Sequence, residues 1–375
     1  MEITAAVLEK MGLPRPYAES RPLKVERLAL ADPGPGEILV EIRAAGLCHS
    51  DLSVIDGNRP RPLPMALGHE AAGIVRALGP GVDDLAVGDH VVLVFVPSCG
   101  HCAPCMEGRA ALCEPGARAN GAGTLLSGAR RLSRNGTPVN HHLGVSAFAD
   151  HAVVSRRSAV KVPRDLPFEE AALFGCAVIT GVGAAVNTAG VRPGATVAVV
   201  GLGGVGLNAV LGARLAGAER IIALDLVDEK LALARELGAT DTLRADAPDA
   251  ADTVREWTSG GVDCAIETAG ATPALELAWN LTRRGGVTVT AGLPHPDARL
   301  ALAPVQLVGE ERTLKGSYLG SAVPRRDVPR YIALYRRGLL PVDRLLGGRW
   351  RLERINEAFD ALASGHALRE IVLFD

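Results

Sequence analysis

Six of the seven cysteines fall into two groups that have the residue types of metal sites. Four form a compact C-x2-C-x2-C-x7-C cluster: Cys99, Cys102, Cys105 and Cys113. Cys48 and Cys176 lie far apart, and His69 lies between them in the sequence. Four thiolates complete a tetrahedral zinc shell, whereas two thiolates and one imidazole leave a fourth position open to water or substrate. The chain therefore predicts two zinc ions, one structural and one able to do chemistry.

Two other interpretations of the four-cysteine cluster are a redox pair and a nucleic-acid-binding zinc finger. A redox C-x-x-C motif uses two cysteines rather than four. A nucleic-acid binder needs a basic patch, but the net charge is -2 and Lys and Arg are spread along the chain. We therefore expect a structural zinc that holds a lobe around residues 97–115, and no nucleic-acid partner.

The dispersed set is weaker as a motif, since a single Cys or His is more often a core residue than a ligand. Local context favours the ligand interpretation. Cys48 is followed by His49, Ser50 and Asp51 just past a predicted strand, and His69 is followed by Glu70. Cys176 lies at the predicted border between two structural units, where a cofactor-bearing cleft is expected. Cys264 lies in an apolar strand context and is interpreted as a core residue.

A glycine-rich run predicts a dinucleotide site. The run follows the apolar strand T-V-A-V-V, opens a helix and contains Gly201, Gly203, Gly204, Val205 and Gly206. In a G-x-G-x-x-G turn the glycines permit the tight turn, the approach of the pyrophosphate and close packing of helix on strand. Asp225 ends the next strand, where a carboxylate binds ribose hydroxyls and repels a 2′-phosphate, so NAD is favoured over NADP.

The order of expected elements divides the chain into a β-rich unit and an α/β unit. Strands are predicted at 37–43, 71–77 and 90–96, followed by a long excursion over 114–142. From about residue 167 helices and buried strands alternate: helices at 168–187, 207–216 and 228–237, strands at 196–200, 221–224, 262–267 and 287–290. This alternation predicts a doubly wound parallel sheet. We assign 1–177 and 320–375 to the β-rich domain and 178–319 to a Rossmann dinucleotide-binding domain.

The composition is that of a globular protein of 375 residues, with 48% apolar and 22% charged residues. The uncharged runs 171–191 and 193–213 contain many glycines, so we interpret them as buried core and expect no membrane partner. The N-terminal residues show no basic segment followed by an apolar stretch, from which we expect no secretory signal and a cytoplasmic location.

Together these residues resemble the zinc-dependent medium-chain alcohol dehydrogenases over essentially the whole chain. The likeness lies in C-H-S-D (48–51), G-H-E (68–70), the four-cysteine cluster, F-G-C (174–176), G-L-G-G-V-G (201–206) and Asp225. The chain is similar to the long liver-type subgroup in its length and in the excursion over 114–142. The excursion contains G-T-L-L-S-G-A-R-R (123–131) and leads into H-H-L-G (141–144). The resemblance implies a GroES-like catalytic domain, a Rossmann domain, NAD, two Zn(II) per subunit and a homodimer.

The resemblance also implies residue roles. Cys48, His69 and Cys176 would hold the catalytic zinc, which lowers the pKa of a bound alcohol before hydride transfer to NAD. Ser50 would take the alcohol proton, Asp51 would orient His69, and Glu70 would lie behind the metal. The residues that would contact the cofactor are His49, Arg369, Lys230, Thr180 and Val205, and those of the substrate pocket are Phe95 and His142.

The chain departs from the family pattern at two positions. Ser53 stands where a histidine often ends the proton relay, so the relay is left to Ser53, water or another base. His142 occupies a place in the pocket wall that is commonly aromatic. Together with Ser50, which stands in place of Thr, it would let the pocket admit a larger or more polar alcohol. The alternative is that His142 points into solvent.

The expected reaction is reversible oxidation of primary or aryl alcohols to aldehydes. One alternative is glutathione-dependent formaldehyde oxidation (on S-hydroxymethylglutathione), which the basic 58–61 stretch and Ala117 beside Arg118 disfavour. A non-catalytic binding role is disfavoured because every expected ligand and the relay hydroxyl are present.

Overall fold

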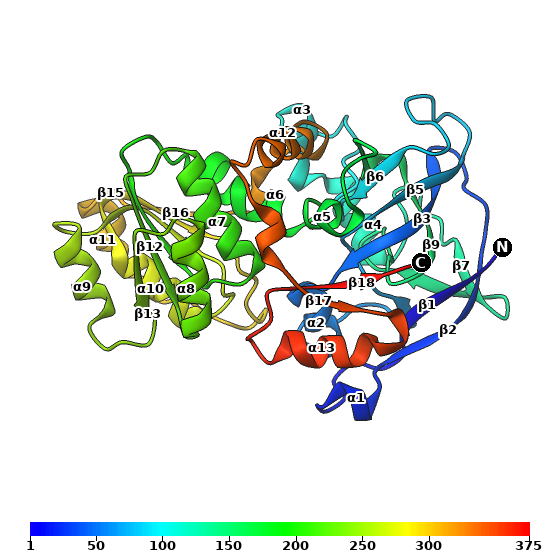
Figure 1. Cartoon of the computed structure of the whole chain (residues 1–375), viewed down its shortest axis with the longest axis horizontal. Coiled ribbons are helices and arrows are strands. Elements are labelled where there is room, and N and C mark those ends of the chain that lie inside the picture. Colours follow the sequence, from blue (N-terminus) through cyan, green and yellow to red (C-terminus); the bar gives the residue numbers. More distant parts are fainter. The chain divides into compact units, whose positions relative to one another are not determined.

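The computed structural model describes all residues, 1–375, and they form two units (Figure 1). Unit 1 comprises Met1–Cys176, Val323–Arg330 and Leu346–Asp375, and unit 2 comprises Ala177–Ala322 and Tyr331–Leu345. Residues 320–322 and 331–345 therefore belong to unit 2, although the whole of 320–375 was expected in the β-rich domain. The reason is burial, because Val342 and Leu345 are fully buried there.

Unit 1 contains a small closed barrel and a larger sheet. The barrel has the strand order β1 (Glu2–Leu8), β2 (Leu23–Leu30), β7 (Leu132–Arg134), β8 (Thr137–His141) and β4 (Met65–Ala66). The sheet has the order β10 (Ala159–Val162), β6 (His90–Leu93), β5 (Ala71–Leu78), β3 (Glu37–Gly46), β18 (Arg369–Leu373) and β17 (Leu346–Trp350), and β9 (His151–Ser155) also pairs with β3.

The register of this sheet brings three strand ends together. Ala45 of β3 lies opposite Ala71 of β5, and Gly46 lies opposite Ile371 of β18. The end of β3 leads to Cys48, the start of β5 follows His69, and β18 begins at Arg369. One edge of one sheet therefore positions residues from three distant parts of the sequence.

Short helices connect the strands of unit 1. They are α1 (Tyr17–Ser20), α2 (His49–Ile55), α3 (Ala103–Met106), η1 (Ala110–Leu112), α4 (Glu114–Ala122), η2 (Arg156–Ser158), α5 (Phe168–Leu173), η6 (Leu352–Arg354) and α13 (Ile355–Ala363). The region 114–142, expected as a long excursion, is ordered as α4, β7 and β8. Its strands belong to the barrel because Leu132 and Val139 are buried in the barrel core.

Unit 2 is a six-stranded parallel sheet, which confirms the Rossmann prediction. Its order is β13 (Asp241–Arg244), β12 (Arg220–Asp225), β11 (Thr196–Val200), β14 (Val262–Glu267), β15 (Thr282–Thr290) and β16 (Thr313–Gly316). Its helical segments are α6 (Ala177–Gly183), η3 (Ala184–Ala189), α7 (Gly204–Leu215), α8 (Asp228–Leu237), α9 (Ala250–Trp257), α10 (Thr272–Leu281), α11 (Pro304–Gly309), η4 (Leu319–Ser321) and η5 (Val342–Leu345). A further helix, α12 (Pro324–Arg336), contributes residues to both units.

The helix predicted over 168–187 is broken. α5 ends at Leu173, α6 begins at Ala177, and Gly175 and Cys176 lie between them. A Cβ at Gly175 would come within 2.4 Å of the backbone oxygen of Leu93, so only glycine fits at this close approach. The break places Cys176 on a turn rather than on a regular helix.

None of the helices has both the length and the apolar character needed to cross a bilayer.

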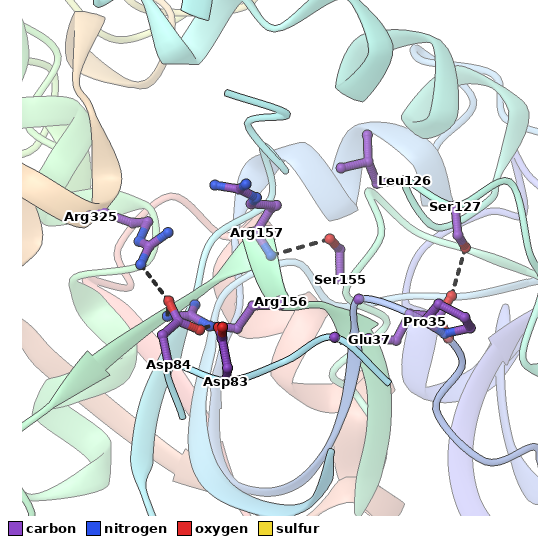
Figure 2. A pocket seen from close by; sticks show the side chains of 12 residues that line it. Pro35, Glu37, Asp83, Asp84, Leu126, Ser127, Ser155, Arg156, Arg157 and Arg325 are labelled. Atoms are coloured by element: carbon purple, nitrogen blue, oxygen red, sulfur yellow. Dashed lines mark hydrogen bonds and ion pairs between the residues drawn. The ribbon is translucent and has the colours of Figure 1, made fainter. Parts of the chain in front are cut away.

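A cavity of about 380 Å³ lies on unit 1 among β3, β9 and the 126–127 turn (Figure 2). Asp84 accepts hydrogen bonds from both Arg156 and Arg325, and Ser127 donates to buried Glu37. Asp84, Arg156 and Arg325 on its walls thus form one ion-paired group. The cavity contains none of the predicted site residues, so we interpret its polar lining as structural.

His141, at the end of β8, gives this fold a pH dependence. Burial lowers its pKa to about 4, and its Nε2 accepts a hydrogen bond of 3.0 Å from the Arg131 amide, which requires a neutral ring. The unfolded chain therefore binds more protons than the fold between about pH 6.5 and 4, so stability is present above pH 6.5 and is lost as pH falls through this window. Between pH 7.5 and 5.0 this amounts to about 2 kcal/mol.

We expect His141→Gln, which keeps an acceptor but does not titrate, to lose about 2 kcal/mol less than the wild type over the same interval. Urea unfolding of both proteins at pH 7.5 and 5.0 measures the difference. Equal losses in the two proteins would show that His141 is not held neutral.

Candidate functional site

The three dispersed ligands predicted from the sequence converge in unit 1. The two Sγ atoms of Cys48 and Cys176 and a ring nitrogen of His69 all lie within 4.8 Å of one another. Cys48 precedes the first turn of α2, His69 lies between β4 and β5, and Cys176 lies in the turn after α5. All three side chains are buried. Two thiol groups and an imidazole so arranged could hold a zinc ion with one position left open.

The orientation of His69 fits a metal ligand. Its Nδ1 lies 2.8 Å from Oδ2 of Asp51, while its Nε2 is buried with no hydrogen-bond partner. A buried ring nitrogen without a partner costs free energy, and a metal ion would satisfy it. Burial alone would lower the pKa of His69, but Asp51 and Cys48 raise it to about 10. Zinc binding must therefore displace a proton from this ring.

The thiol of Cys48 favours its ionised form. A hydrogen bond from the Cys176 thiol and the charge on His69 hold the pKa of Cys48 well below its ordinary value, against the effect of burial. Thiolate is the form that binds metal.

Gly68, next to His69, has φ +94°, and a Cβ there would lie 2.4 Å from the backbone nitrogen of Phe148. The backbone before His69 therefore requires glycine.

The remaining predicted residues of unit 1 surround this set. The ring of Phe95 lies 5.3 Å from that of His69 in an edge-to-face arrangement. Glu70 is fully buried and forms an ion pair with Arg369 at the start of β18. Ser50 is half-buried on α2, whereas His49 is exposed.

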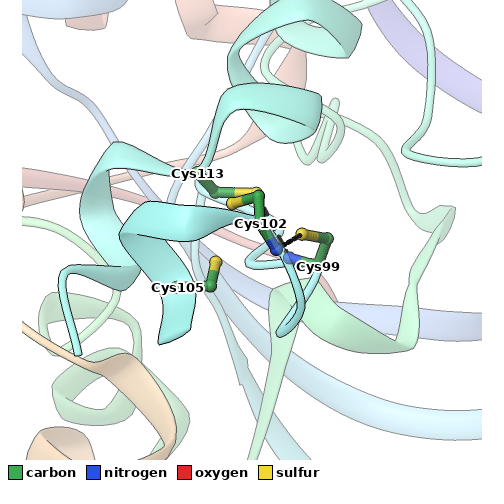
Figure 3. Close-up of side chains that lie close together, drawn as sticks. All are labelled: Cys99, Cys102, Cys105 and Cys113. Atoms are coloured by element: carbon green, nitrogen blue, oxygen red, sulfur yellow. Dashed lines mark hydrogen bonds between the residues drawn. The ribbon is translucent and has the colours of Figure 1, made fainter. Parts of the chain in front are cut away.

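The four clustered cysteines form a second group (Figure 3). Their Sγ atoms lie within 4.8 Å of one another, and the backbone amides of Cys99 and Gly116 donate to Sγ of Cys113. Burial raises the pKa of Cys105 to about 12, whereas backbone amides outweigh burial and lower that of Cys99 to about 7. Four sulfurs at this spacing fit a closed structural zinc site.

The glycine loop of unit 2 has the geometry of a phosphate cradle. Gly201 has φ +90°, and a Cβ at Gly206 would lie 1.8 Å from the Gly201 oxygen, so both positions require glycine. A Cβ at Gly203 would meet nothing within 4 Å, so the space over the amino end of α7 is open. Free amides at a helix N-terminus favour an anionic group such as a pyrophosphate.

Asp225 lies at the end of β12, as the fingerprint requires. Its Oδ2 accepts a hydrogen bond of 2.5 Å from the Leu202 amide in the glycine loop, and its Oδ1 accepts from the amides of Leu226 and Val227. Its carboxylate therefore fixes the shape of the glycine loop. Thr180 is buried on α6, and Val205 and Lys230 are partly buried.

Comparisons with known proteins agree with this geometry. Residues 34–164 match the alcohol dehydrogenase GroES-like domain, and residues 204–337 match the zinc-binding dehydrogenase family. An NDMA-dependent alcohol dehydrogenase of Amycolatopsis methanolica is 40% identical over 100% of this chain and 99% of its own length. The chain belongs to the zinc-dependent medium-chain alcohol dehydrogenase family. It is accordingly an oxidoreductase of the zinc alcohol dehydrogenase type.

Two further members of the family bear on specificity. The crystal structure of benzyl alcohol dehydrogenase from Acinetobacter calcoaceticus has a TM-score of 0.93, with 34% identity over 100% of both chains. An S-(hydroxymethyl)glutathione dehydrogenase of Paracoccus denitrificans is 36% identical and covers 94% of this chain and 97% of its own. The chain is therefore similar to one relative named for each of the two substrate classes considered from the sequence.

Two contacts in this alcohol dehydrogenase were not expected from the sequence. Glu70 forms an ion pair with Arg369, although Glu70 was expected behind the metal and Arg369 at the pyrophosphate. His142 neither points into solvent nor merely lines a pocket, because it is 1% exposed and its Nδ1 lies 3.0 Å from Oδ1 of Asp51. No local spacing links these positions, so neither contact could have been found without the tertiary structure.

The hydroxyl of Ser53 donates to the backbone oxygen of His49, four residues earlier on α2.

Proposed function

We propose that this protein oxidises a primary or aryl alcohol to an aldehyde, reversibly, with NAD as the hydride acceptor. The observation that carries the proposal is the buried convergence of Cys48, His69 and Cys176, with Nε2 of His69 left without a partner. When bound there, zinc lowers the pKa of an alcohol hydroxyl and polarises an aldehyde carbonyl.

The surrounding side chains would orient the ligands and move the proton. Asp51 holds Nδ1 of His69, so that Nε2 keeps its lone pair for the metal. Ser50, on the first turn of α2, would accept the alcohol proton at its Oγ and pass it outward. Because the Ser53 hydroxyl already donates to the His49 backbone oxygen, we assign the outer end of the relay to water. Phe95 would exclude water from the reacting carbon.

The proposed NAD site rests on the glycine loop and Asp225. The amides over Gly203 would hold the pyrophosphate, and the carboxylate of Asp225 would bind the adenosine ribose and repel a 2′-phosphate. Lys230 would contact the same ribose, and Thr180 and Val205 the nicotinamide. His49 and Arg369 are proposed for the pyrophosphate. Arg369 also forms an ion pair with Glu70, so a pyrophosphate contact would have to compete with this pair.

Two substrate classes are in competition, and the proposal favours alcohols over the glutathione adduct of formaldehyde. The stretch after Gly57 is basic, with Arg59 and Arg61, where the glutathione-dependent branch has an acidic contact. Ala117 stands where that branch has an arginine. A turnover assay comparing benzyl alcohol with formaldehyde plus glutathione separates the two classes. Activity that strictly requires the thiol would reject the alcohol proposal.

The cofactor proposal is tested at Asp225. We expect wild-type protein to prefer NAD over NADP, and Asp225→Ala to reduce kcat/KM for NAD by about 10–100-fold, since hydrogen bonds to a charged group contribute about 1.5–3 kcal/mol. Activity with NADP should fall less or rise. Assays include NDMA with and without NAD, because one relative is named for NDMA dependence. Turnover with NADP alone would overturn the proposal.

We further propose a homodimer acting in the cytoplasm, as the family resemblance implies. Light scattering of the purified zinc-loaded protein tests the first part, and a monomer at working concentration would contradict it.

A further inference from the structure

Asp51 lies between two buried histidines that come from different parts of unit 1. Its Oδ2 faces Nδ1 of His69 at 2.8 Å, and its Oδ1 faces Nδ1 of His142 at 3.0 Å and accepts the amide of Gly68 at 3.1 Å. Asp51, His69 and His142 are each at most 1% exposed. The two imidazole rings meet edge to face, 5.7 Å apart. The proposed metal ligand and His142 thus share one carboxylate.

Both oxygens of the Asp51 carboxylate need hydrogen-bond donors. A buried carboxylate is costly unless its oxygens accept hydrogen bonds, and each lost donor leaves lone pairs unsatisfied in a low-dielectric surrounding. Without His142, Oδ1 would keep only the Gly68 amide. The carboxylate could then rotate, and its rotation would break the 2.8 Å contact of Oδ2 with Nδ1 that orients His69.

The backbone of His142 is well placed to hold such a contact. Its amide donates to Oγ of Ser146 at 2.9 Å and to the backbone oxygen of Ala66 at 3.3 Å. His141, the preceding residue, pairs with Ala66 in the parallel β4–β8 ladder of the barrel. His142 therefore projects from a fixed strand end, whereas Asp51 comes from α2.

We propose that His142 is a positioning residue: it holds Oδ1 of Asp51, the oxygen that does not face His69, and thereby fixes the metal-binding orientation of the His69 ring. This inference rests on the proposed role of His69 as a zinc ligand. It assigns the imidazole of His142 to retention of the metal, beyond its expected place in the wall of the substrate pocket. The His142–Asp51–His69 bridge couples the barrel to the metal site.

The test is the rate at which a chelator removes zinc from the full-length, zinc-loaded protein. His142→Phe keeps an aromatic ring but removes the donor, and His142→Asn keeps an N–H donor near the position of Nδ1. We expect His142→Phe to lose one of its two zinc ions about 10–100-fold faster than wild type, since the direct partner of a ligating histidine, here Asp51, contributes this much to metal affinity and His142 acts through it. His142→Asn should be close to wild type, and loss of the second zinc should be unchanged in both.

A double variant separates positioning from packing. If His142 acts through Asp51, His142→Phe should add nothing to the faster zinc loss of Asp51→Asn. Additive effects, or a wild-type rate in His142→Phe, would overturn the proposal. His142→Leu is the second donor-free variant if His142→Phe does not fold. Zinc release is measured without alcohol or cofactor, so its rate does not depend on whether the proposed reaction takes place. A failure of the proposed reaction can therefore be told apart from a failure of this inference.

Discussion

Replacing Cys176 by alanine should abolish alcohol turnover while leaving the fold largely intact. Cys176 is one of the three buried groups that converge on the open metal site, and two remaining ligands would hold zinc poorly. Losing the Lewis acid removes several kcal/mol of transition-state stabilisation, so we expect kcat/KM to fall about a thousand-fold or more. Metal analysis should show one zinc per subunit instead of two.

The matched control for this prediction is Cys264→Ala. Cys264 is 7% exposed, close to the 6% of Cys176, but it lies on β14 in the core of unit 2 and outside both metal-binding clusters. Its replacement should change stability modestly and keep both zinc ions and full turnover. If Cys176→Ala retained two zinc ions and near-normal activity, the assignment of the catalytic ligands would be wrong.

Cys105→Ala should have the opposite profile, with its main effect on stability. The lobe that contains Cys105 has little apolar core: α3 buries no residue, and Met106 and Leu112 are 74% and 41% exposed. Zinc must therefore supply the stabilisation that apolar burial supplies elsewhere, and structural zinc contributes folding free energy directly. We expect one zinc to be lost and the lobe to unfold, at a cost of several kcal/mol to unit 1.

Limited proteolysis and hydrogen exchange over residues 97–115 measure this effect. Protection in the lobe should disappear in Cys105→Ala, while the sheet of unit 2 keeps its protection. Turnover per remaining zinc should change far less than in Cys176→Ala. Wild-type protein that bound only one zinc per subunit would contradict the division into structural and catalytic sites.

The family and the fold could be predicted from the sequence because their motifs are local. The four clustered cysteines and the G-x-G-x-x-G turn each lie within a few residues, where covalent spacing limits the geometry. The doubly wound sheet follows from alternating periodicity. Two local features were mispredicted: the 168–187 helix is interrupted at Gly175 and Cys176, and the 114–142 region supplies the barrel strands β7 and β8. Close backbone approach and long-range strand pairing, both non-local, decided these cases.

The sequence by itself determined which residue types could bind zinc and a dinucleotide, and it nominated Cys48, His69 and Cys176 as a set. Only the tertiary structure decided how they meet, since the end of β3 lies beside the start of β5 and so places Cys48 near His69, while the turn after α5 brings Cys176 to them. It also decided the pairing of Glu70 with Arg369 and the sharing of Asp51 by His69 and His142. Such contacts form between side chains on different elements, and their geometry is set by strand register and packing, which no local spacing encodes.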